Sequence, residues 1–276
     1  MPTKLQDSDR ELLRYCHELR FCTVDHLVAL TGRLRQSLNV RILQLVAEKY
    51  IYRITFPNPN QKHVYTIGTE GFKYLAHHGI ISINDVPERF RANELKPLFL
   101  NHTIFVTDIH TTLLLASRSN QLQIADWREG KDIYDDVTFY ENGRKIRLPV
   151  CPDGFFSIAN AARPAPNNRL AFALEADRST TTRRTFNDKM RAYCQYLEQN
   201  RQEKFFGVKW FRVLTVTLTK ARADSLTELA AETVPDKLQK FFLFTSRENF
   251  SLENPKPIYE SVYRTPKADN LFSLMP

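Results

Sequence analysis

Two acidic residues at the ends of apolar stretches, with a lysine further along the chain, are the residues best suited to chemistry. Asp153 follows Pro152, and Glu175 ends the apolar run 170–174. Lys189 lies in a later segment whose apolar residues repeat at helical spacing. Carboxylate oxygens bind Mg²⁺ or Mn²⁺ beside a phosphate, and a lysine stabilises the negative charge that develops there. These residues predict metal-assisted cleavage of a phosphodiester.

A structural interpretation of the same acids stays open on the sequence alone. Asp153 precedes a glycine and is suited to a loop turn. Glu175 or Asp177 could pair with an arginine that follows, either Arg178 or Arg183. Buried ion pairs of this kind join elements of a fold without doing chemistry.

The segments before residue 80 predict three helices, a hairpin and a closing helix. Ser8 and Glu11 form a candidate capping box, Thr23 is a candidate N-cap, and a break rich in proline and asparagine separates two strand-forming runs. We expect helices at 9–20, 24–31, 34–49 and 70–78, with strands at 50–56 and 62–67. This order is typical of a winged helix, in which the third helix enters the major groove of DNA.

The third helix and the hairpin carry the residues expected to contact double-stranded DNA. The buried side of that helix is predicted to hold Leu34, Leu38, Ile42, Leu45 and Val46. Arginine and amide side chains make bidentate contacts to base edges, and cationic side chains suit phosphates. Base contacts are expected from Arg35, Gln36 and Asn39, and phosphate contacts from Arg33, Arg41, Lys49, Arg53 and Lys62. The alternative is a dimerisation module, which would give a homodimer.

The remainder of the chain predicts an α/β domain with a mixed sheet at 96–276, after a linker at 81–95. We expect helices at 101–118 and 186–200, and a third that begins after Thr219 and ends near residue 232. The expected strands are 121–127, 137–140, 145–150, 170–175, 212–218, 240–244 and 257–263. With the first domain at 1–80, the chain has two domains.

The composition is typical of a folded globular protein with a negatively charged partner. The formal net charge of +8 favours a polyanionic partner, and 42% hydrophobic residues are typical of a folded globular protein. No apolar run is long enough to span a membrane, and the first residues lack the apolar core of a signal peptide, so we expect a cytoplasmic protein. Four scattered cysteines disfavour a zinc site or a disulfide framework.

The central stretch resembles the core of the PD-(D/E)xK nuclease superfamily, and the chain from about Ser8 to Val262 resembles the plasmid replication-relaxation family. The residues that carry the resemblance are Pro152-Asp153, Glu175-Ala-Asp177, Arg178, Thr180, and Lys189 to Tyr193. It implies a winged helix followed by a mixed-sheet fold of the restriction-endonuclease type. It also implies a role in replication, mobilisation or regulation of a mobile element, with duplex DNA and other mobile-element proteins as partners.

The resemblance assigns roles to the acidic residues and the lysine. The catalytic set would be Asp153, Glu175, Asp177 and Lys189, with Mg²⁺ or Mn²⁺ held by Asp153 and Glu175. The nuclease pattern expects a lysine two residues after the second acid, where this chain has Asp177. Lys189 can replace it only if it points toward the strand ends, and an inactive domain would need no cofactor.

Overall fold

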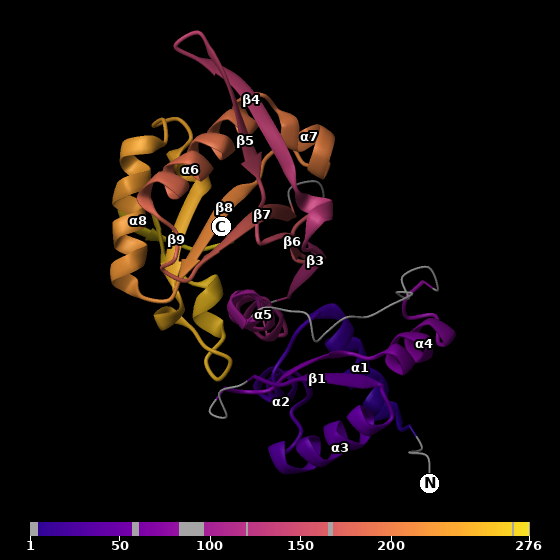
Figure 1. The fold of residues 1–276 in the computed structure, drawn as a ribbon. Coiled ribbons are helices and arrows are strands. Elements are labelled where there is room, and N and C mark those ends of the chain that lie inside the picture. Colours follow the sequence, from indigo (N-terminus) through magenta and orange to yellow (C-terminus); the bar gives the residue numbers. More distant parts are fainter. Residues whose placement is uncertain are drawn as a thin grey trace. The chain divides into compact units, whose positions relative to one another are not determined.

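The chain divides into two compact units, Met1–Thr111 and Thr112–Pro276, each described here by itself. The computed structural model describes residues 5–56, 61–82, 97–119, 121–164, 168–266 and 268–275 (Figure 1). Most of the predicted linker at 81–95 lies outside these residues. The division falls within helix α5 (Pro97–Ser117) and not at its start, where the sequence predicts the second domain to begin.

The first unit has the predicted order of three helices, a hairpin and a fourth helix. Its elements are α1 (Asp7–Glu18), α2 (Val24–Thr31), α3 (Arg35–Ala47), β1 (Ile51–Ile54), β2 (Val64–Ile67), α4 (Thr69–His77) and the part of α5 up to Thr111. Strands β1 and β2 pair antiparallel, with Arg53 opposite Tyr65. Thr23 is the N-cap residue of α2, as predicted, and Gly32 ends that helix with a left-handed φ of 67°.

Two local predictions for the first unit are wrong. The N-cap residue of α1 is Gln6, whose backbone N–H donates to the Asp9 carboxylate at 2.7 Å, so Ser8 and Glu11 do not form the capping box. Leu34 is 78% exposed and not part of the buried side of α3. It precedes the first turn of the helix in an extended conformation, so helical periodicity does not place it beside Leu38.

In the described part of the second unit, a seven-stranded mixed sheet has the order β11-β10-β9-β8-β7-β6-β3. Strands β7, β8 and β9 are parallel to one another, and the other neighbours pair antiparallel. The strands are β3 (Leu122–Arg128), β6 (Gly154–Asn160), β7 (Arg169–Asp177), β8 (Arg212–Thr217), β9 (Phe242–Ser246), β10 (Tyr263–Thr265) and β11 (Ala268–Phe272). The fold is therefore mixed α/β, as predicted.

The strands predicted at 137–140 and 145–150 form a hairpin that stands apart from this sheet. Its strands, β4 (Asp135–Glu141) and β5 (Arg144–Val150), form a two-stranded sheet of their own and project beyond the other strands (Figure 1). Asn142 and Gly143 at its turn both have positive φ, as the Asn-Gly pair predicts. The inner face packs on the main core through Val137 and Val150.

Helices α6 (Arg183–Glu198), α7 (Arg201–Phe206) and α8 (Lys220–Thr233) complete this core. Phe186 and Met190 of α6 are buried in one cluster with Val213 and Phe244 of the sheet. The sequence predicts neither of the strands β6 and β11, nor helix α7. It placed an edge strand at 257–263, where the structure has a short 3-10 helix, Lys256–Tyr259, followed by β10, because the prolines there favour a turn.

None of the helices described in the structure combines the length and the apolarity that crossing a membrane requires.

Candidate functional site

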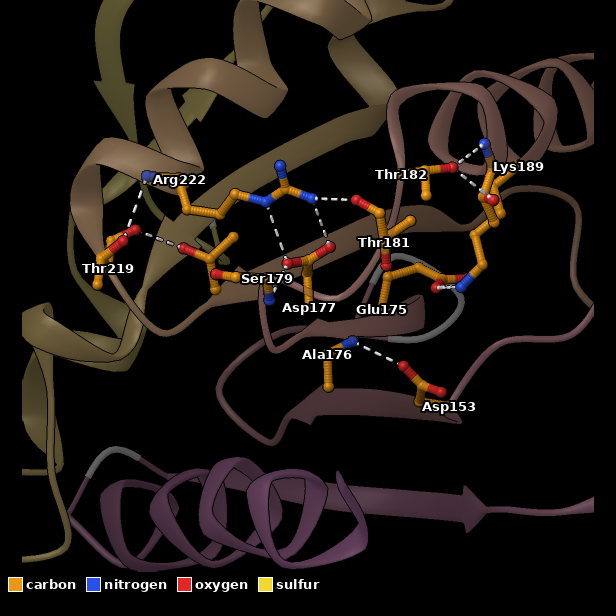
Figure 2. A network of polar contacts seen from close by, with 12 residues as sticks. Asp153, Glu175, Ala176, Asp177, Ser179, Thr181, Thr182, Lys189, Thr219 and Arg222 are labelled. Atoms are coloured by element: carbon orange, nitrogen blue, oxygen red, sulfur yellow. Dashed lines mark hydrogen bonds and ion pairs between the residues drawn. The ribbon is translucent and has the colours of Figure 1, made fainter. Parts of the chain in front are cut away.

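Asp153 and Glu175 lie next to each other at the start of β6 and near the end of β7. Gly154 pairs with Leu174, so the antiparallel register puts Asp153 opposite Glu175. The Asp153 backbone N–H donates to the Leu174 carbonyl at 2.8 Å, and its carboxylate accepts from the Ala176 N–H at 2.7 Å (Figure 2). The strand pairing therefore brings the two predicted acids together.

Lys189 points toward these strand ends from helix α6, as its predicted role requires. The helix begins after Thr182, whose hydroxyl accepts the Thr185 N–H at 3.2 Å. Lys189 and Tyr193 are one helical turn apart and therefore share a face. Lys189 Nζ donates to Glu175 Oε2, and Tyr193 Oη donates to Glu175 Oε1 at 2.5 Å. Both oxygens of Glu175 thus accept a hydrogen bond from α6.

Burial and neighbouring charges set the electrostatics of this group. Glu175 is only 6% exposed, and this burial raises the pKa of its carboxyl, with the Asp153 carboxylate acting in the same direction and Lys189 opposing it. Burial acts to lower the pKa of Lys189, but the carboxylates of Glu175 and Asp153 outweigh it and raise that pKa. With both acids ionised, the three groups carry one net negative charge, which favours a cation.

Asp177 faces a different partner. Its carboxylate accepts from Arg222 Nε at 3.2 Å and Arg222 Nη2 at 3.1 Å, and Arg222 also donates to the Thr181 carbonyl at 2.7 Å (Figure 2). The Ser179 N–H donates to the same carboxylate at 2.6 Å. This fork geometry is the strong form of an ion pair. Asp177 therefore joins the end of β7 to the first turn of α8.

The donor set suits a magnesium ion only in part. Mg²⁺ is commonly held by one or two carboxylates together with water and substrate phosphates, so Asp153 and Glu175 match it in number and type. Within the described residues, no group of three or more His, Cys, Asp or Glu side chains could hold a metal ion. Any further ligands would come from water and phosphate, since Asp177 is engaged by Arg222.

Some of the residues predicted to contact DNA are exposed, and others are partly buried or paired with an acidic residue of the protein. Gln36 and Asn39 on α3 and Arg53 on β1 are exposed. Arg35 and Lys62 are exposed but both pair with Asp25, Lys62 at 2.5 Å. Of the three remaining residues, Lys49 is exposed, whereas Arg33 and Arg41 are partly buried.

Arg41 has a structural role. Its Nη2 lies 2.5 Å from Asp9 Oδ2 and its Nε donates to Asp9 Oδ1 at 2.8 Å. Asp9 is fully buried, and although burial acts to raise its pKa, the hydrogen bonds from Arg41 and the Gln6 N–H lower that pKa overall. Helical spacing alone placed Arg41 on the outer side, because the buried acid that holds it lies in another helix.

The sequence does not predict that Arg222 engages Asp177 or that Tyr193 donates to Glu175. Arg222 follows a Thr219 N-cap after a parallel strand, and the N-terminal turn of such a helix lies at the carboxyl end of the sheet. That placement was the signal available for it. In the first unit, His26 Nε2 lies 2.8 Å from Asp108 Oδ1, a contact between residues too far apart in sequence to predict.

Comparison with known proteins gives one family. The family model described as replication-relaxation matches residues 13–208, which is more than half of the chain. Searches of curated proteins and of solved structures found no significant match. The match begins within α1 and covers the hairpin of the first unit and the Asp153, Glu175 and Lys189 group. The chain belongs to the replication-relaxation family.

Proposed function

We propose that this chain is a cytoplasmic DNA-binding protein of a plasmid or other mobile element. Its family suggests a role in replication or mobilisation of such elements. In this proposal the first unit is a winged helix that selects a duplex site. The second unit is a nuclease-like domain of the PD-(D/E)xK type that binds a protein partner or more DNA.

The observation that carries the proposal is the set of exposed amide and cationic side chains on α3 and on the short hairpin that follows it, among which Val40 and Leu43 of α3 are also exposed. Gln36 and Asn39 are exposed near the start of α3, where their amides can reach adenine in the major groove. Arg53 on β1 and Lys62 before β2 are exposed cations suited to phosphates. Asp25 partly neutralises Arg35 and Lys62, so DNA phosphate would compete with it.

Site selection from random duplexes by the full chain tests this proposal. We expect the Gln36→Ala, Asn39→Ala double variant to lose site preference, because the amides provide base contacts. Gln123→Ala, which removes an exposed amide from β3 of the second unit, is the matched control and should keep the preference. An unchanged selected site in the double variant would contradict the assignment of α3 as the reading helix.

A second candidate function is a Mg²⁺- or Mn²⁺-dependent DNA endonuclease, favoured by the convergence of Asp153, Glu175 and Lys189. Asp153 and Glu175 would hold the ion, which supplies Lewis acidity at a phosphate and an activated water. Lys189 would stabilise negative charge on the phosphate, provided that substrate or metal draws its ammonium from Glu175. Tyr193 holds Glu175 through its other oxygen and so keeps the carboxylate in place.

The endonuclease function is tested by nicking of supercoiled plasmid with Mg²⁺ or Mn²⁺. We expect cleavage by the wild type and its loss in Asp153→Asn and in Glu175→Gln, with DNA affinity retained. Asp188→Asn changes a half-exposed acid on α6 that pairs with Arg191 and does not contact Glu175, and it serves as the control. Lack of cleavage by the wild type on DNA that it binds would leave this group of residues a structural one.

A further inference from the structure

A cavity of about 540 Å³ opens at the end of the sheet opposite to Asp177. It lies at the amino ends of β7 and β8, which begin at Arg169 and Arg212, whereas Asp177 ends β7. The loop between α7 and β8, including Lys209 and Trp210, forms another part of its wall. None of the residues assigned above to duplex binding or cleavage lines it.

The charge of this cavity is one-sided. Its lining includes Arg169, Lys209 and Arg212 and no acidic residue. Arg169 pairs with Asp126, which leaves Lys209 and Arg212 as the cations least neutralised by the protein. Arg212 gives one hydrogen bond to the Leu274 carbonyl at 3.3 Å, and burial lowers its pKa, although a guanidinium stays charged near neutral pH. Such a lining favours an anionic ligand.

An exposed tryptophan, packed on a partly buried phenylalanine, lies beside these cations. The Trp210 ring stacks on Phe241, with centroids 5.3 Å apart and an angle of 10° between the planes, and Trp210 remains 54% exposed. The Lys240 ammonium lies 5.2 Å from the centre of the Phe241 ring. Phe241 therefore holds the indole flat while much of its surface stays in water. An exposed, oriented indole next to cations is suited to stack a nucleobase whose phosphates meet the cations.

We propose that this cavity binds single-stranded DNA, with a base stacked on Trp210 and neighbouring phosphates held by Lys209 and Arg212. A duplex is disfavoured here because its bases are stacked on each other and do not present a face to an indole. The lining also contains apolar residues, but a wholly apolar ligand is disfavoured because it would offer no anionic group to Lys209 and Arg212. The inference goes beyond the proposed function and uses none of its residues, so either can fail without the other.

Binding of a fluorescein-labelled oligothymidylate of about 15 nucleotides to the full chain, followed by anisotropy, tests this site. We expect Trp210→Ala to weaken binding at least about fivefold through loss of one stacked base. Lys209→Ala should weaken binding and reduce the slope of log affinity against log salt by about 0.7. Tyr140→Ala removes a 74% exposed aromatic from the separate hairpin and should bind as the wild type does.

A second readout reports on Trp210 directly. The chain has two tryptophans, and Trp127→Phe leaves Trp210 as the fluorophore. We expect the oligonucleotide to quench this emission, because a stacked base contacts the indole. Circular dichroism of each variant separates lost binding from lost folding.

Three outcomes would overturn the inference. In the first, folded Trp210→Ala binds the oligonucleotide as tightly as the wild type does. In the second, saturating oligonucleotide does not quench the Trp210 emission. In the third, the protein binds duplex DNA but does not bind single-stranded DNA. Failure of duplex selection by the wild type would bear on α3 alone, whereas failure of single-strand binding would bear on this cavity.

Discussion

Lys189 and Glu175 form an ion pair between helix α6 and strand β7, and this pair brings a lysine to the acids from outside the expected motif. The position two residues after the second acid holds Asp177, which Arg222 engages. The lysine and the two acids nevertheless meet, because the crossover from β7 returns α6 along the sheet. The lysine can therefore lie at another position in the sequence than the motif expects and still meet the two carboxylates in the fold.

Loss of Lys189 should destabilise the fold. In Lys189→Met, the Glu175 carboxylate stays buried without its cation, and we expect the free energy of unfolding to fall by about 3 kcal/mol. The Lys189 side chain is 35% exposed, so solvent screening reduces the loss toward about 2 kcal/mol. Urea unfolding measures it. Adding Glu175→Gln to Lys189→Met should restore much of the stability, and an additive further loss would contradict a direct pairing.

The Asp177 and Arg222 pair should contribute to stability more than an exposed pair does. Asp177 is 7% exposed, and Arg222→Ala would leave its carboxylate with only the Ser179 N–H among the contacts described above. We expect a loss of about 3 kcal/mol in urea unfolding. Arg183→Ala breaks the exposed pair with Glu232 and should cost less than about 1 kcal/mol. Equal losses in the two variants would refute the distinction.

Removal of Arg41 should lower the stability of the fold, whereas removal of Arg53 should lower the affinity for duplex DNA. Arg41→Ala deprives the buried Asp9 of its cation, and we expect a loss of about 3 kcal/mol in the free energy of unfolding. Arg53→Ala removes an exposed side chain and should change stability by less than about 0.5 kcal/mol while weakening duplex binding. Unfolding and duplex affinity, measured on both variants, check this. Full stability of Arg41→Ala would show that the pair does not hold α1 to α3.

The free energy of unfolding should fall in mild acid because of the buried His110. Burial lowers the pKa of His110 to about 3, with His26 acting in the same direction. Below pH 6.5 the unfolded chain binds a proton that the folded protein does not, so stability is lost as the pH falls. The contribution of this group is about 2 kcal/mol between pH 7 and pH 5.

Urea unfolding at the two pH values measures that loss. His110→Gln should show a smaller difference between pH 7 and pH 5 than the wild type, because glutamine does not titrate. His63→Gln changes an exposed histidine and should leave the difference as it is in the wild type. The same pH dependence in all three proteins would rule out His110 as its source.

Local sequence signals predicted most elements of this fold. Thr23 is the N-cap of α2 as predicted, and Gly32 and the Asn142-Gly143 turn have the positive φ that these residue types favour. The stretch 154–160 was missed as strand β6, because it is apolar along most of its length and follows a loop with no regular alternation. Its two strand neighbours, and not its own pattern, make it a central strand.

The candidate site was predictable in its members but not in its pairings. Asp153, Glu175 and Lys189 could be named from residue type and position. The pairing of Asp177 with Arg222 could not, since it joins residues 45 positions apart through a parallel strand arrangement that the sequence does not display. The engagement of Arg41 by Asp9 is similar, because the two residues lie on different helices, 32 positions apart in the sequence.

The order of the strands also determines the order in which the contacts at the carboxyl end of β7 form during folding. Strands β6 and β7 are antiparallel neighbours in sequence, so Asp153 and Glu175 can meet by closing a short loop. Arg222 reaches Asp177 only after β8 has paired parallel to β7 across the α6 crossover, which requires a longer loop and is intrinsically slower. During synthesis the chain must extend past residue 222 before this ion pair can form. Its formation would therefore report that the crossover is complete.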